Sequence, residues 1–124
     1  MNFRIVEKGG LKAAFAQGET PFLSDVQSAL DLIAAASYEA DAQRVALKKE
    51  DVNPDFFRLG TGLAGEILQK FTNYGMKVAF YGDFEALLKN SEPFRAFVTE
   101  SNKGSTVFFA KDEDEAVERL FGSS

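Results

Sequence analysis

The sequence predicts an α/β fold in which helices pack on a mixed β-sheet within a single domain, residues 1–124. Three observations lead to this class. The first residues alternate apolar and polar side chains as a β-hairpin does, later segments carry apolar residues at helical spacing, and residues 76–81 form an almost unbroken apolar run. Strands that alternate with helices through short loops give the order ββαβαβαβα, with right-handed crossovers.

A β-hairpin is expected at the start of the chain. Gly9 and Gly10 supply the positive φ angles that a tight turn needs. On either side of them, apolar side chains alternate with polar ones at Phe3, Ile5, Leu11, Ala13 and Phe15. Residues 18–22, which include Pro21, then break the pattern before the first helix.

The first helix is expected to begin at Ser24, which forms a capping box with Gln27, and to run to about residue 36. Its inward stripe follows helical spacing at Val26, Ala29, Leu30 and Ile33. Residues 44–47 then form a short strand, which ends in the charged residues Lys48, Lys49, Glu50 and Asp51.

A second helix is expected from about residue 62 to residue 73, ending at Gly75. Its inward side chains are Leu63, Ile67, Leu68, Phe71 and Tyr74. The apolar run at 76–81 follows as a strand that is covered on both faces, and we expect it to be the central strand.

The last third of the chain adds three helices and a strand. Residues 83–90 form a short helix, and Ser91 caps another that has Pro93 in its first turn. That helix ends at residues 102–104, where Asn102 or Gly104 takes the left-handed conformation. Residues 106–110 form a strand, and Asp112 caps a final helix whose inward side chains are Ala116, Val117, Leu120 and Phe121.

Composition excludes several classes of function. The chain has no Cys and no His, which removes disulfides, thiolate metal sites and Ser-His or Cys-His catalysis within one chain. We expect no cofactor, no metal and no catalytic residue. Its 14 basic and 19 acidic side chains give a net charge of -5, which disfavours nucleic acid as a partner. Apolar runs are too short to span a bilayer, so we expect a cytoplasmic protein with no membrane partner.

Several spaced motifs carry a family resemblance over nearly the whole chain. Residues 61–84, TGLAGEILQKFTNYGMKVAFYGDF, the later ESNKG and the closing acidic helix resemble the bacterial family of domain of unknown function 4180. In element order the chain is also similar, more distantly, to the STAS domains of anti-sigma-factor antagonists. That resemblance implies a phosphorylatable hydroxyl at Thr61, before Gly62, although Leu59-Gly60 replaces the Asp that precedes the phosphoacceptor in those antagonists.

Two interpretations of Thr61 remain open. Its hydroxyl can act as an N-cap, because Thr is among the residues preferred at that position. It can also carry a phosphate, since the positive end of a helix stabilises negative charge. The glycines at 60, 62 and 65 do not form a nucleotide-binding loop, because GTGLAGE lacks the Gly-Lys-Ser/Thr ending.

Three further polar residues are candidates for the same surface. Asp83 follows the strand at 76–81, where the carboxyl ends of parallel strands gather ligand groups, but it is equally an N-cap for the next helix. Glu66 lies on the outer face of its helix, where it is either an ordinary solvent-exposed residue or part of a binding site. Lys48 leaves its strand at the same expected edge of the sheet.

The leading hypothesis is therefore a STAS-like regulatory or protein-interaction module without catalysis of its own, acting around Thr61, Gly62, Glu66, Asp83 and Lys48. It binds a protein partner or a small ligand. The alternative is a small enzyme or ligand-binding domain that uses carboxylates and a lysine at the strand carboxyl ends, completed across a homodimer. Phe56 and Phe57 are expected in the core, and their exposure would instead mark a partner surface.

Overall fold

A computed structural model describes residues 2–18 and 21–122, and in these residues the strands form one five-stranded sheet of order β1-β2-β3-β4-β5. The first pair, β1 and β2, is antiparallel, and every later neighbour is parallel. The strands are β1 (Asn2–Lys8), β2 (Leu11–Gln17), β3 (Arg44–Lys48), β4 (Lys77–Tyr81) and β5 (Val107–Ala110). The predicted fold class, a mixed sheet with packed helices, is confirmed. The observed order, ββαβαβααβα, agrees with the predicted ββαβαβαβα except that two helices lie between β4 and β5.

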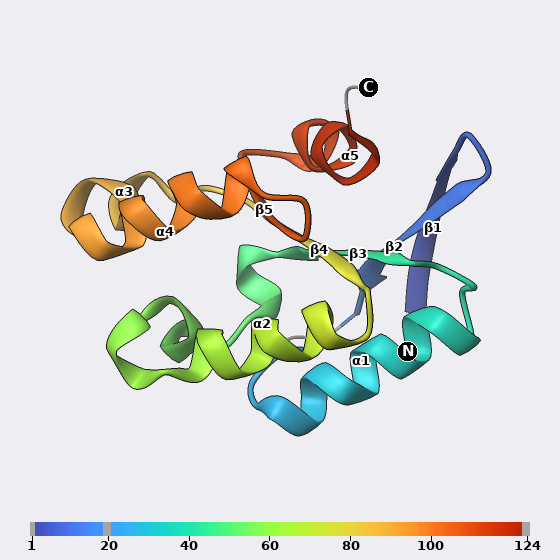
Figure 1. Cartoon of the computed structure of the whole chain (residues 1–124), viewed down its shortest axis with the longest axis horizontal. Helices are drawn as coiled ribbons and strands as arrows, with labels where there is room; N and C mark the ends of the chain where they lie inside the picture. The colour runs from blue at the N-terminus through green and yellow to red at the C-terminus, as the bar shows by residue number, and fades with distance from the viewer. Residues whose placement is uncertain (1, 19–20, 123–124) are drawn as a thin grey trace.

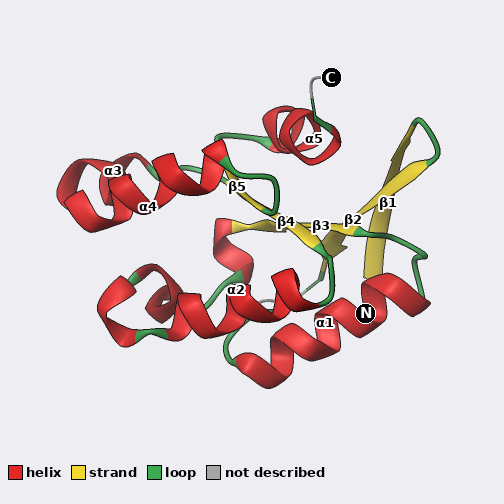
Figure 2. Cartoon of the chain, viewed as in Figure 1, coloured by secondary structure: helices red, strands yellow, loops and turns green. Residues whose placement is uncertain are grey.

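The helices lie on both sides of this sheet (Figure 1). They are α1 (Val26–Tyr38), α2 (Leu63–Asn73), α3 (Glu85–Asn90), α4 (Glu92–Lys103) and α5 (Glu113–Phe121). Short 3-10 helices at Lys49–Asp51, Pro54–Phe57 and Leu59–Thr61 join β3 to α2. Figure 2 shows α1 and α2 together below the strands, α5 above them, and α3 with α4 beyond the β5 side of the sheet.

Two hydrophobic clusters, one on each face of the sheet, account for this arrangement. The larger cluster joins α1, α2 and α4 to one face through side chains such as Val45, Val78 and Phe109. The smaller cluster joins α5 to the other face through Ala46, Ala79 and similar small residues. Because the parallel strands follow one another in chain order, right-handed crossovers put the connecting helices on the same face. Among the described strands the parallel order never reverses, so the sheet has no topological switch point.

The hairpin is confirmed, with Gly9 and Gly10 at φ values of 57° and 79° between its strands. Residues 19–20 of the predicted break lie outside the described residues. The expectation that residues 76–81 form the central strand is wrong, because β3 occupies the centre and β4 lies between β3 and β5. The apolar run shows only that both faces of a strand are covered, which holds for every interior strand.

The start of α1 also differs from the prediction. The N-cap is Asp25, whose carboxylate accepts the Ser28 N–H at 2.7 Å, while the Ser28 hydroxyl oxygen accepts the Asp25 N–H at 3.0 Å. The capping box is therefore formed one residue later than Ser24 and Gln27 would form it. The fully buried side of the helix accordingly comprises Ala29, Leu32, Ile33 and Ala36, and Val26 and Leu30 are partly buried.

Two other local predictions are wrong at helix ends. Tyr74, predicted to point inward, is 66% exposed, because it is the C-cap of α2 and the chain turns there into Gly75 at φ 66°. Gly104 ends α4 in an extended conformation, φ -87°, and not in the left-handed one. At both helix ends, the backbone conformation of the C-cap residue depends on the direction in which the chain continues.

The loop between β3 and α2 contributes to the core. Phe56 and Phe57 are 1% and 7% exposed, so the core interpretation of these two residues is confirmed. Their rings lie 5.0 Å from Phe80 and 5.6 Å from Phe84, measured between centroids. The 3-10 helix Pro54–Phe57 thereby anchors a long connection to β4 and to the start of α3.

Candidate functional site

The carboxyl ends of three parallel strands form one edge of the sheet, as the sequence predicts. Lys48, Tyr81 and Ala110 lie side by side in register at this edge. From there, Lys49 Nζ donates a hydrogen bond of 3.0 Å to the carbonyl of Asp83, and an Asp83 carboxylate oxygen accepts the Glu85 N–H at 3.0 Å. Lys48 and Asp83 are both exposed. The carboxylate of Asp83 thus organises the start of α3 and remains open to solvent.

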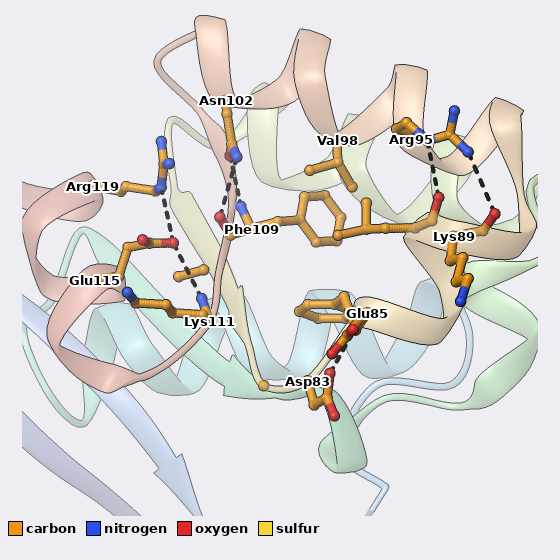
Figure 3. Close-up of a pocket in the computed structure, with 14 residues that line it drawn as sticks. Asp83, Glu85, Lys89, Arg95, Val98, Asn102, Phe109, Lys111, Glu115 and Arg119 are labelled. Carbon is orange, nitrogen blue, oxygen red and sulfur yellow. Dashed lines mark hydrogen bonds and ion pairs between the residues drawn. The ribbon is translucent and has the colours of Figure 1, made fainter.

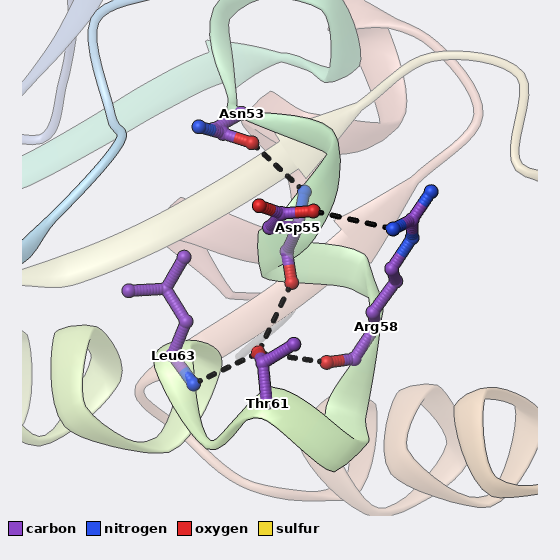
Figure 4. A network of polar contacts seen from close by, with 5 residues as sticks. All are labelled: Asn53, Asp55, Arg58, Thr61 and Leu63. Carbon is purple, nitrogen blue, oxygen red and sulfur yellow. Dashed lines mark hydrogen bonds and ion pairs between the residues drawn. The ribbon is translucent and has the colours of Figure 1, made fainter.

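Thr61 lies on a different part of the surface, where its hydroxyl holds together the loop before α2 (Figure 4). The hydroxyl oxygen accepts the Leu63 N–H at 3.2 Å, and the hydroxyl lies 2.9 Å from the carbonyl of Arg58 and 3.3 Å from that of Asp55. Gly62, at φ 78°, is the N-cap residue of α2. The Thr61 hydroxyl thus accepts an N–H at the start of α2, as the capping interpretation expects, but the N-cap position itself belongs to Gly62.

Glu66 is exposed in the first turn of α2, where a negative charge complements the helix dipole. The structure therefore brings two of the predicted residues, Lys48 and Asp83, to one edge of the sheet, and it places Thr61, Gly62 and Glu66 together at the start of α2.

A groove of about 900 Å³ lies between α5 on one side and α3 with α4 on the other, over β5 (Figure 3). Its apolar lining consists of Phe84, Leu88, Val98 and Phe109. Its polar lining includes Asp83, so one predicted residue borders the groove. Charged side chains surround the apolar part: Asp83, Glu85, Lys89, Arg95, Lys111, Glu115 and Arg119. Concave sites with an apolar floor and a few polar groups are where proteins usually bind ligands.

The groove follows the outer edge of β5, which is the last strand of the sheet. The Asn102 side chain donates to the Phe109 carbonyl at 3.2 Å and accepts the Phe109 N–H at 2.8 Å. A Glu115 carboxylate oxygen accepts the Lys111 N–H at 3.1 Å. Unpaired edge strands invite pairing with other chains, and here two side chains satisfy the exposed backbone groups.

A second recess of about 450 Å³ continues along the same strand edge toward Gly104 and Ser105. Three side chains line both recesses: Asn102, Glu115 and Arg119. Among the described residues, the buried Nε atom of Arg119 has no hydrogen-bond partner, and the nearest carboxylate oxygen, on Glu115, is 3.6 Å away. We call the two recesses together the β5 trough. Sequence reasoning missed it, although Asn102 lies within the ESNKG motif that carries the family resemblance.

A separate polar cluster lies at the start of α5, on the face of the sheet that α5 covers. Tyr81 is 7% exposed, and its hydroxyl is 3.4 Å from a carboxylate oxygen of Glu113, which forms an ion pair with Arg4. Burial, with the nearby carboxylates of Glu113 and Asp51, raises the pKa of Tyr81 to about 12. Burial also raises the pKa of the Asp51 carboxyl, which is 2% exposed and accepts the Lys48 N–H at 3.0 Å.

The raised pKa of Tyr81 predicts a late step in an alkaline titration. The chain has three tyrosines and no tryptophan, so tyrosinate absorbance is free of tryptophan background and reports the ionisation of three side chains. One tyrosine should ionise near pH 12, compared with an ordinary value of 10.0, and Tyr81→Phe should remove that step. Since the folded pKa lies above the unfolded one, the stability contributed by neutral Tyr81 is present below pH 10 and lost as the pH rises toward 12.

The matched variant for this titration is Glu113→Gln, which removes a neighbouring negative charge and keeps the size of the side chain. It should lower the pKa of Tyr81, because the Glu113 carboxylate disfavours the phenolate. An unchanged late step in Glu113→Gln would show that Glu113 does not influence Tyr81.

The fold and the β5 trough define the chain as an α/β domain with a concave, mixed-charge recess beside its last strand. Residues 8–120 match the family described as domain of unknown function (DUF4180), and the chain belongs to this family. Comparison with curated proteins and with solved structures finds no match. The distant similarity to STAS domains stays a prediction. Within the described residues, no helix is both long enough and apolar enough to cross a membrane.

Proposed function

We propose that this protein is an interaction module without catalysis of its own, which holds its partner in the β5 trough. The observation that carries the proposal is the groove of about 900 Å³ with an apolar floor built from Phe84, Leu88, Val98 and Phe109. Its walls come from elements on opposite faces of the sheet, since α4 packs with one cluster and α5 with the other. The trough thus lies between helices on opposite faces of the sheet, as the ligand crevice does at a topological switch point in other α/β domains.

The charges around the trough favour a partner with acidic groups. Four basic side chains, Lys89, Arg95, Lys111 and Arg119, line the groove beside three acidic ones, Asp83, Glu85 and Glu115, so its lining carries a small positive excess in a chain whose net charge is -5. Arg95 caps the end of α3 through a bond of 3.0 Å from Nε to the Leu88 carbonyl, which fixes its guanidinium at the rim. Complementary charge at a rim guides association and orients a partner, while the apolar floor supplies most of the affinity.

One observation favours the alternative, a small enzyme or ligand-binding domain, because Asp83 borders the groove at the strand carboxyl ends. The contacts of this region point to a structural role. Lys49 Nζ donates to the Asp83 carbonyl, and the Asp83 carboxylate accepts the Glu85 N–H. Lys48, on the neighbouring strand, extends into solvent. A lysine acts as a base or nucleophile when burial or a neighbouring cation lowers its pKa, and an exposed side chain lacks that burial.

Site-specific photocrosslinking tests the proposal. A photoreactive phenylalanine analogue replaces Lys89 or Glu85, both exposed beside the groove, and in matched variants it replaces Gln69 on the outer face of α2 or Thr61. We expect the same discrete adduct from Lys89 and Glu85 in the native host cells, and none of it from Gln69. Adducts that form equally from all four positions would contradict the proposal. An adduct from Thr61 alone would move the interaction surface to the start of α2.

A further inference from the structure

The backbone of β5 presents its free polar groups to the trough. Val78 N–H donates to the Thr106 carbonyl and Gly82 N–H donates to the Ala110 carbonyl, so the even-numbered residues of this strand bond to β4. In a parallel pair the intervening residues then turn their N–H and C=O groups the other way. Phe109 and Lys111 therefore point their backbone groups outward, into the trough.

The side chain of Asn102 imitates a residue of a neighbouring strand. In an antiparallel ladder, two residues that face each other closely exchange two N–H···O bonds. Asn102 makes the same pair of bonds with Phe109, at 3.2 and 2.8 Å, through its own carboxamide. A Glu115 carboxylate oxygen accepts the Lys111 N–H, as a backbone carbonyl of a neighbouring strand would. Two side chains thus occupy the positions that belong to a further strand (Figure 3).

We infer that the β5 trough receives an extended polypeptide segment, which adds to β5 as a sixth strand and displaces the Asn102 and Glu115 side chains. This inference rests on the proposed function and names the partner's chemistry. The exchange replaces each side-chain hydrogen bond at β5 with a backbone one, so the strand loses none of its partners. It also brings peptide carbonyls to the buried Nε of Arg119, which has no acceptor within residues 2–18 and 21–122.

The lining of the trough specifies the side chains of that segment. Successive side chains of a strand point to opposite sides, so apolar residues at every second position would contact Val98 and Leu88. Acidic residues at the ends of the segment would face Lys89 and Lys111. Main-chain bonds supply affinity in this mode of binding, and alternate side chains supply specificity.

A tethered peptide tests the inference. The chain has no Cys, so Lys89→Cys gives one attachment point at the rim of the groove. The probe is a capped peptide, Glu-Val-Thr-Val-Thr-Val-Glu, joined through a flexible glycine-serine linker, which raises its effective concentration. By heteronuclear NMR we expect the Asn102 side-chain amide resonances to move to solvent-exposed positions. The peptide amides should exchange with solvent about tenfold more slowly than in the same peptide free in solution.

The matched control is the same tethered peptide with N-methyl groups at alternate amides, which keeps the side chains and prevents strand pairing. The inference requires that this control leave the Asn102 amide resonances in place. If both peptides shift the groove resonances equally, strand addition is overturned and groove binding stands. If neither shifts them, strand addition is overturned, and crosslinking from Lys89 and Glu85 still decides the proposed function.

A second measurement separates an exchangeable side chain from one that only supports the fold. Asn102→Ala removes the competitor for the Phe109 backbone and should raise the docked fraction of the tethered peptide several-fold. Glu115→Ala, which frees the Lys111 N–H, provides the same test without altering α4. A docked fraction that falls in a folded sample of either variant would overturn the inference.

Discussion

Replacing Phe109 with Ala should lower the free energy of unfolding by about 3–5 kcal/mol, as expected for a large aromatic side chain removed from a core. Phe109 is 3% exposed, and its ring centroid lies 5.3, 5.5, 5.7 and 5.8 Å from those of Phe80, Phe84, Phe94 and Phe97. The substitution leaves the two backbone bonds to Asn102 in place. The loss therefore reports on the aromatic cluster alone, and urea denaturation measures it.

Tyr74→Ala is the comparison for this variant, because it also removes an aromatic ring. Tyr74 is 66% exposed at the end of α2, so its loss should change stability by less than about 0.5 kcal/mol. If Phe109→Ala costs no more than Tyr74→Ala, the packing of α3, α4 and β5 around this ring is wrong, and with it the floor of the β5 trough.

Gly82→Ala should cost about 2–6 kcal/mol, although it adds a single methyl group. Gly82 joins β4 to the loop before α3 at φ +145°, a conformation that side chains other than glycine rarely adopt, with a strain of about 1–3 kcal/mol. An added Cβ would lie 3.0 Å from the Cβ of Lys49, so crowding contributes a similar amount. The same contact would push Lys49 away from the Asp83 carbonyl at the wall of the groove.

Gly65→Ala provides the opposite result within the same chain. Gly65 lies in α2 with nothing within 4 Å of an added Cβ, so alanine there should stabilise the protein by about 0.5–1 kcal/mol. Denaturant midpoints of the two variants should thus move in opposite directions. Equal shifts would show that the backbone at Gly82 is not held in the conformation described above.

The regular elements of this protein follow from local patterns that the sequence contains in full. Two adjacent glycines between alternating residues gave the β1-β2 hairpin, and Ser91 followed by Pro93 gave the start of α4. The local predictions failed where two adjacent residues were equally suited to the same position. At the start of α1, for example, the N-cap is Asp25 and not the predicted Ser24. Ser and Asp are both good N-caps, so propensity alone does not distinguish the two positions.

The candidate site was less accessible to sequence reasoning. The rule that strand carboxyl ends gather ligand groups directed attention to Lys48 and Asp83, and the resemblance to STAS domains directed it to Thr61. The rule depends on a reversal of strand order, and the described strands run in sequence from β2 to β5. Asn102, whose amide closes the strand edge, looked like an ordinary residue near the end of a helix. Its role depends on β5 lying beside α4, which no local pattern encodes.

The sequence by itself determined the class of fold, the order of the elements, the buried faces of most helices and the family, because hydrophobic periodicity and turn residues act over a few neighbouring positions. Only the tertiary structure decided which strand is central and that a trough runs along the free edge of β5. These features depend on contacts between segments that are distant in the chain. Such contacts form only when the helices pack on both faces of the sheet.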